Sequence, residues 1–169
     1  MLGEKLSAPD GVEAGGEIKG MGLLPMETVF QNLKTRTRVS GTFPKVEGAL
    51  SSLTGVKLEG YEIHMGESVL LEGAHPFTEI TDHVQNTTKQ DGAYCNNVYG
   101  SYVHGIFDKE AVAKNIVKAI GEEKGLDVSE MTGIDFAAFK ETQYDKLADG
   151  LRKHLDMKKI YEILEAGLE

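Results

Sequence analysis

The spacing of apolar residues changes near Asp108, and this change constrains the fold more than any other feature. Before it, apolar residues alternate with polar ones, as in Val56–Met65, which is typical of strands. After it, Val112, Ile116 and Ile120 recur at helical spacing. A chain of 169 residues is long enough for one domain with its own core. The sequence therefore predicts an α/β layered domain, strand-rich in its first two-thirds and helical at its end.

Several short segments of the first two-thirds are β-prone. Thr35–Phe43 alternates threonine with arginine, which predicts a strand with one solvated face. Pro25 interrupts an apolar run and favours an edge strand or a passage into a loop. Ala49–Thr54 indicates a turn or a short helical piece. Further strands are expected at Val69–Leu71, Phe77–Ile80 and Val98–Val103, and loops at Ser7–Gly20 and Gln85–Asn97, the latter with Asp91-Gly92 as its turn signal.

Gly60 lies where the alternation of its strand changes phase. Val56 and Leu58 precede it on one face, and Tyr61 and Ile63 follow it in the other phase. A glycine at such a point is typical of a β-bulge or a strand break. We therefore expect Tyr61, Ile63 and Met65 on the apolar face, with Glu62 and His64 on the face opposite Ile63.

Helix boundaries are predicted from capping residues. Asp108 is expected to cap a helix that Gly121 ends, and Asp135 and Asp156 are expected to cap two later helices. Ile134 and Phe139 occupy the positions of a hydrophobic staple before the second helix. The second helix is expected to continue through Tyr144, Leu147, Leu151 and Leu155, and Ile163 and Leu164 are expected on the buried face of the third helix.

Charge and cysteine content exclude several classes of partner. The formal net charge is −9 and no Lys/Arg cluster stands out, so neither nucleic acid nor an anionic membrane is an expected partner. One cysteine, Cys95, fits a reducing compartment, and we expect the chain to be cytoplasmic. Met1-Leu2-Gly3 resembles the last turn of a helix, and Leu168-Glu169 resembles a remnant of an expression tag.

His104 is the strongest candidate for chemistry. It ends an apolar β-prone run and precedes Gly105, so its imidazole is expected to face a cleft from a rigid base. Imidazole can take up and return a proton near neutral pH, although a structural or solvated histidine is the alternative. Cys95 is a poor nucleophile because no strand-to-helix elbow surrounds it. No spacing typical of a metal site is present.

Five motifs occur in the order found in one family. They are Met21-Gly-Leu-Leu-Pro-Met-Glu-Thr28, Gly60-Tyr-Glu-Ile-His-Met-Gly66, Asp91-Gly92, Gly100-Ser-Tyr-Val-His-Gly-Ile-Phe-Asp108, and Gln143-Tyr-Asp-Lys-Leu-Ala-Asp149 with His154-Leu-Asp-Met157. Across residues 1 to 165 the chain resembles the C-terminal glutamine amidotransferase region of the cobyric acid synthase (CobQ) family. The resemblance implies a partial class I glutamine amidotransferase-like, flavodoxin-like layered domain over residues 1–167. Residues 1–107 would carry the catalytic histidine, and residues 108–167 the C-terminal helices.

The resemblance also implies a function in cobalamin (vitamin B12) biosynthesis. Family members use ATP and ammonia from glutamine to amidate side-chain carboxylates of adenosylcobyrinic acid a,c-diamide. The expected partners are glutamine, an N-terminal synthetase domain and, through that domain, the corrin substrate. ATP and Mg²⁺ would bind the synthetase domain, and no cofactor or metal is expected within these residues.

The same resemblance assigns roles to individual residues. His104 matches the base that activates a cysteine nucleophile, and that cysteine would lie just ahead of Met1, so the chain alone is expected to be inactive. Ile106 stands where the wider class has a glutamate, as the cobyric acid synthase subgroup also does. Glu62 and His64 belong to a family motif and are expected to bind substrate or to be structural. Alternatives are a lipid II amidating enzyme or a non-catalytic binding module, and self-association through a truncated sheet edge is expected.

Overall fold

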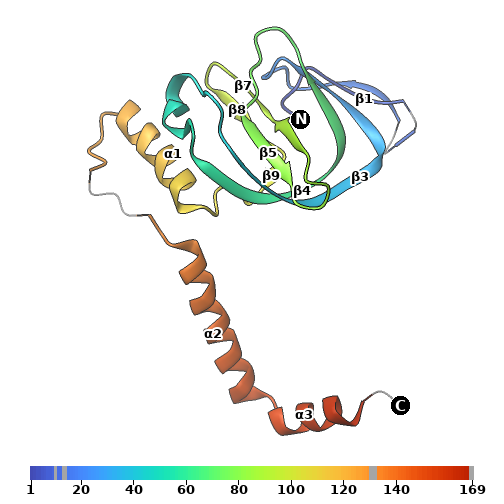
Figure 1. Ribbon diagram of the computed structural model, residues 1–169, viewed down its shortest axis with the longest axis vertical. Helices are drawn as coiled ribbons and strands as arrows, with labels where there is room; N and C mark the ends of the chain where they lie inside the picture. Colours follow the sequence, from blue (N-terminus) through green and yellow to red (C-terminus); the bar gives the residue numbers. More distant parts are fainter. Residues whose placement is uncertain (10, 13–14, 130–132, 168–169) are drawn as a thin grey trace. The chain divides into compact units, whose positions relative to one another are not determined.

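The computed structural model describes residues 1–9, 11–12, 15–129 and 133–167. The chain divides into two compact units, Met1–Gly133 and Ile134–Glu169. The first unit contains the sheets and one long helix (Figure 1). Its elements are β1 (Lys5–Ala8), β2 (Gly16–Lys19), β3 (Met26–Thr42), the 3₁₀ helix η1 (Gly48–Leu53), β4 (Lys57–Leu70), β5 (Thr78–Asp82), β6 (Thr88–Asp91), β7 (Ala93–Cys95), β8 (Val98–Gly100), β9 (Val103–His104) and α1 (Glu110–Glu123).

The main sheet has the strand order β2-β1-β3-β4-β9, and β5 and β6 extend it from β3. Strands β7 and β8 form a separate two-stranded sheet. The mixture of sheet and helices confirms the predicted α/β class. A mostly parallel sheet, as the flavodoxin-like description implies, is not found: among the described strand pairs only β1–β3 is parallel. Parallel neighbours need a connection that returns the chain to the same end of the sheet, and among these strands only β1 and β3 have one, which runs through β2.

β3 and β4 form a long curved antiparallel pair (Figure 1). The predicted bulge at Gly60 is wrong, because the pairing with β3 runs unbroken through Val39–Gly60, and the register shift falls between Phe30 and Thr35. Gly60 is needed for another reason: a Cβ there would overlap the main-chain oxygen of His104 on the neighbouring strand β9. Since no phase change occurs, Leu58 and Glu62 share the buried face, whereas Tyr61 and Ile63 are exposed.

The predicted strand Thr35–Phe43 is confirmed as part of β3, with Arg36 and Arg38 on its solvated side. Pro25 directly precedes β3, and η1 confirms the helical piece near Ala49. Other expectations are wrong. The loop Ser7–Gly20 contains strand residues, the loop Gln85–Asn97 contains β6 and β7, the strand Val98–Val103 divides into β8 and β9, and Met1-Leu2-Gly3 is not helical.

The first helix begins one residue later than predicted. Lys109 is the N-cap residue of α1 and makes no side-chain capping bond, so the prediction that Asp108 caps the helix is wrong. Gly121 does not end the helix either, since α1 continues to Glu123. Gly121 is buried within it, where a Cβ would overlap the side chain of Val128. This glycine therefore allows the chain that follows the helix to pack closely.

The second unit consists of α2 (Phe136–His154) and α3 (Met157–Ala166). Asp135 accepts a hydrogen bond from the Ala138 amide at 3.0 Å, and Asp156 accepts one from Lys159 at 3.0 Å, so both predicted caps are confirmed. The expectation of a buried face on the third helix is not met, because no described residue of either helix is buried. The predicted remnant Leu168-Glu169 lies outside the described residues.

Two clusters of apolar side chains form the core of the first unit. The larger one lies between the sheet and α1 and is extended by partly buried neighbours. The buried members of the larger cluster are Val39, Phe43, Val46, Leu53, Leu58, Phe77, Ile80, Tyr94, Val103, Ile106 and Val112, and those of the smaller one are Leu24, Met26 and Ala93.

None of the helices in the described ranges is long and apolar enough to cross a membrane.

Candidate functional site

His104 ends the edge strand β9 and is exposed, as its sequence setting predicts. It pairs with Tyr61 of β4, and the two rings stack with centroids 5.1 Å apart and an angle of 8° between their planes. Within the described part of the chain, no hydrogen bond engages either ring nitrogen. The stacking holds the ring in one orientation, and both nitrogens remain available to solvent or to a substrate.

The three predicted site residues do not come together. Cross-strand partners in an antiparallel pair project to the same face of a sheet, and neighbours along a strand project to opposite faces. His104 pairs with Tyr61, whereas the buried Val103 pairs with Glu62. His104 therefore lies on the outer face of β4, and Glu62 lies on the inner face, together with His64.

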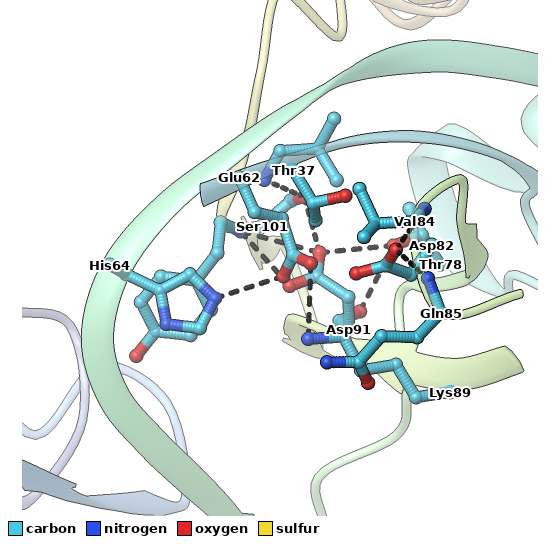
Figure 2. Close-up of polar contacts among 12 residues, drawn as sticks. Thr37, Glu62, His64, Thr78, Asp82, Val84, Gln85, Lys89, Asp91 and Ser101 are labelled. Carbon is cyan, nitrogen blue, oxygen red and sulfur yellow. Dashed lines mark hydrogen bonds and ion pairs between the residues drawn. The ribbon is translucent and has the colours of Figure 1, made fainter. Parts of the chain in front are cut away.

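His64 lies between two hydrogen-bond acceptors, of which Figure 2 shows Glu62. Its Nδ1 is 2.8 Å from the Gly66 carbonyl oxygen, and its Nε2 is 2.9 Å from Glu62 Oε1. Neither the carbonyl oxygen nor an ionised Glu62 can donate, so this geometry favours the imidazolium, in which both ring nitrogens carry a proton. The hydrogen bond to Glu62 raises the pKa of His64, burial opposes this, and the Gly66 carbonyl adds to it. In this state His64 has no lone pair with which to act as a base.

Glu62 is the buried anion of this group, with only 1% of its surface exposed. Lys89 Nζ of β6 lies 3.0 Å from Oε2, so two cations flank the carboxylate. Burial by itself would raise the pKa of Glu62, but the hydrogen bond from His64 and the ion pair with Lys89 outweigh it and lower the pKa. Glu62 is therefore held as a carboxylate between His64 and Lys89.

This polar group opens into a cavity of about 960 Å³ between β3, β4 and β6. Tyr102 forms part of its wall and stacks on the His64 ring, with 4.8 Å between the centroids. The Tyr102 hydroxyl is 2.6 Å from Ser68 Oγ, which is in turn 2.8 Å from the buried Thr28 Oγ1. The Tyr102 and Ser68 hydroxyls on the cavity wall thus already have hydrogen-bond partners. No group of three or more metal-ligating side chains occurs among the residues that the structure describes.

Sequence reasoning did not identify Asp91 as more than a turn signal. Its carboxylate is 5% exposed and accepts hydrogen bonds from Thr78 and Ser101 (Figure 2). Burial raises the pKa of Asp91, the hydrogen bond from Ser101 lowers it, the charge of Glu62 raises it again, and the net shift is upward. An Asp-Gly pair usually indicates a turn on the surface. Its place in a motif was the only signal for a further role.

The other candidates are placed as follows. Cys95 lies on β7, in the small sheet, and its sulfur accepts a hydrogen bond from Asn96 at 3.5 Å. Ile106 is buried in the larger core cluster, so the position two residues after His104 contributes packing and not charge. Of the remaining histidines, His75 lies against Tyr94 with the two rings tilted by 33°, and His83 forms a hydrogen bond with Ser40.

Comparison with known proteins shows where such a chain belongs. Residues 1–112 match the profile of the CobB/CobQ-like glutamine amidotransferase domain. The chain is 47% identical over 171 residues to a cobyric acid synthase of Ruminiclostridium cellulolyticum, covering 100% of this chain and 33% of that protein. It is 48% identical over 179 residues to a cobyric acid synthase of Lachnoclostridium phytofermentans, covering 99% of this chain and 34% of that protein. The chain thus spans about a third of the length of these relatives.

The family match includes every strand of the sheet, His104 and the inner-face group of Glu62 and His64. The resemblance of the sequence motifs to this family is therefore confirmed. From the matched residues and from the two relatives, the chain belongs to the family of CobB/CobQ-like glutamine amidotransferase domains.

Proposed function

We propose that this chain is the glutamine-hydrolysing part of a cobyric acid synthase. It would supply ammonia for the ATP-dependent amidation of adenosylcobyrinic acid a,c-diamide carboxylates in cobalamin biosynthesis. ATP and Mg²⁺ would act in the synthetase part of the longer protein, which is also the partner that binds the corrin. The observation that carries the proposal is the state of His104, an exposed imidazole that is oriented by Tyr61 and has both nitrogens available.

The chemistry requires a base beside a thiol. Neutral His104 would take the proton from a cysteine, whose thiolate attacks the side-chain amide carbon of glutamine. His104 would then return the proton to the leaving nitrogen, which gives ammonia and a glutamyl thioester that water hydrolyses. His64 is unsuited to this step because both its nitrogens donate to acceptors.

Cys95 is not the nucleophile in this proposal. It is the single cysteine of the chain, and it lies on the β7–β8 hairpin, which does not pair with β9. The proposal places the nucleophile in the longer protein, ahead of the Met-Leu-Gly motif. The chain alone is accordingly expected to hydrolyse no glutamine.

A chimera tests the proposal. The chain replaces the matching third of the Ruminiclostridium cellulolyticum cobyric acid synthase, and corrin amidation is measured with glutamine or with ammonium as the nitrogen source. His104→Gln should lower the glutamine-dependent rate by about 10²- to 10⁴-fold, the usual contribution of a general base. The ammonium-dependent rate should not change, because it bypasses glutamine hydrolysis.

The matched control is His83→Gln, which changes an exposed histidine that bonds Ser40 and lies far along the chain from β9. It should leave both rates unchanged. If His104→Gln leaves the glutamine-dependent rate intact, His104 is not the base, and a non-catalytic binding module becomes the better reading. If it lowers both rates equally, the effect is on folding.

A further inference from the structure

The β7–β8 hairpin separates β6 from β9. β6 ends at Asp91, the chain continues through β7 and β8, and β9 begins at Val103. The two ends of the hairpin lie side by side, since Ala93 pairs with Gly100. Gly92 has a φ of +67°, and a Cβ there would overlap the Gly100 carbonyl oxygen. The segment that leads from the hairpin to His104 therefore begins directly beside Asp91.

The Asp91 carboxylate, which precedes the β7–β8 hairpin, is hydrogen-bonded to the residues that follow it. Its Oδ2 accepts hydrogen bonds from Ser101 Oγ at 2.6 Å and from Thr78 Oγ1 of β5 at 3.1 Å. The Tyr102 amide lies 3.3 Å from each carboxylate oxygen. Ser101 Oγ in turn accepts a hydrogen bond from the Val103 amide at 3.0 Å. A continuous set of bonds thus runs from the end of β6 to the residue before His104.

Backbone pairing constrains β9 little, although Val103 packs in the larger core cluster. β9 is two residues long and lies at the edge of the sheet, and among the residues that the structure describes its strand partners are Tyr61 and Glu62 of β4. Short edge strands are weakly constrained by pairing alone. Because Val103 is buried and His104 is exposed, a small rotation of this segment would move the imidazole relative to its outer-face surroundings.

We propose that Asp91 is a positioning residue for His104, acting through Ser101 and the main chain of residues 101–103. The inference rests on the proposed function of His104 as the glutaminase base. Asp91 does not touch the reacting atoms; it fixes the orientation from which the imidazole of His104 meets the thiol and the amide. A displacement of about 1 Å at a reacting group can cost on the order of 10²-fold in rate.

Ser101→Ala and Ser101→Thr test this connection, because neither removes the buried carboxylate. Nuclear magnetic resonance of the chain itself should show faster hydrogen exchange of the Val103 amide in Ser101→Ala, by about tenfold or more, and a shifted His104 ring signal as the stack on Tyr61 changes. Ser101→Thr retains the hydroxyl and should restore both signals. Asp82→Asn is the matched control, since this half-buried aspartate accepts hydrogen bonds from the Val84 and Gln85 amides and, among the described residues, makes no bond to β9.

In the chimera, Asp91→Asn and Ser101→Ala should lower kcat for glutamine-dependent amidation by about 10- to 100-fold. The KM for glutamine should change much less, the ammonium-dependent rate should stay constant, and Ser101→Thr should recover the rate. If His104→Gln abolishes glutamine use while these variants leave kcat unchanged, the positioning role is wrong and the proposed function stands. If His104→Gln itself has no effect, the proposed function is what fails. An equal loss of the amidation rate with glutamine and with ammonium would also overturn the positioning role.

Discussion

Tyr61 and Glu62 are neighbours on β4, yet the two faces that they occupy differ in almost every physical respect. On the outer face, Tyr61 is 44% exposed and stacks on His104. On the inner face, Glu62 is 1% exposed and lies between His64 and Lys89. The outer histidine has available nitrogens, and the inner one has two acceptors. Two histidines from different motifs thus differ in their hydrogen-bond partners, and this difference is the basis for proposing His104, and not His64, as the base.

The largest expected effect comes from replacing each of the two histidines in turn and measuring both rate and stability. In the chimera, His104→Gln should reduce the glutamine-dependent rate by about 10²- to 10⁴-fold without lowering the urea midpoint of the chain. His64→Gln should do the reverse, lowering the midpoint with a much smaller change in rate, because glutamine cannot replace the charged bond to Glu62. If His64→Gln abolished turnover in a fully folded protein, the division between the faces would be wrong.

Removing the buried charge should have the next largest effect. Glu62→Gln leaves His64 and Lys89 without their anion, and breaking a buried ion pair costs about 3–5 kcal/mol. Urea unfolding followed by circular dichroism measures the loss. Glu59→Gln is the matched control on the same strand: Glu59 pairs with Lys109 in solvent, and its loss should be far smaller. Equal losses for both variants would contradict a structural role for the inner face.

Gly60→Ala tests whether the two strands must approach this closely. The added Cβ would overlap the His104 carbonyl oxygen, so β9 must move, at a cost of about 1–3 kcal/mol. Thermal unfolding gives the change, and the His104 ring signal should shift with it. Gly150→Ala, in α2, meets no neighbouring atom and should stabilise its helix slightly. A neutral Gly60→Ala would show that β9 can be displaced freely.

The His64–Glu62 pair should account for part of the pH dependence of the free energy of unfolding. The pKa of His64 is raised above its ordinary 6.5, so its contribution is complete below pH 6.5 and is lost as pH rises through the folded-state pKa. The pKa of Glu62 is lowered below its ordinary 4.5, so its contribution is lost only as pH falls through the folded-state pKa. The pair is fully effective between these ordinary values.

The difference in unfolding free energy between the wild type and His64→Gln should therefore be largest between about pH 4.5 and 6.5. It should shrink above this range as His64 loses its proton in the folded protein. Taking the difference between the two proteins removes most of the contribution of Asp91, whose pKa is also shifted. A difference that grew steadily toward alkaline pH would show that His64 is neutral in the folded state.

Local chemistry was enough to predict the parts of the chain that depend on near neighbours. Asp135 and Asp156 cap their helices because a carboxylate accepts from an amide three residues later, and this needs no distant contact. The alternation of Arg36 and Arg38 with threonine likewise predicted a solvated strand face. His104 was found because an apolar strand, a histidine and a glycine follow one another in the sequence.

The sequence by itself determined the α/β class, the family resemblance and the exposed position of His104 at the end of a strand. Only the tertiary structure decided that Gly60 makes room for β9 instead of forming a bulge. It also decided that Glu62 lies on the buried face of β4, whereas the alternation predicted Tyr61 and Ile63 on that face. It also decided that Asp91 ties β6 to the chain before His104. The physical reason is the same in each case: close approach, burial and hydrogen-bond partners depend on strands distant in sequence, and spacing along one strand does not encode them.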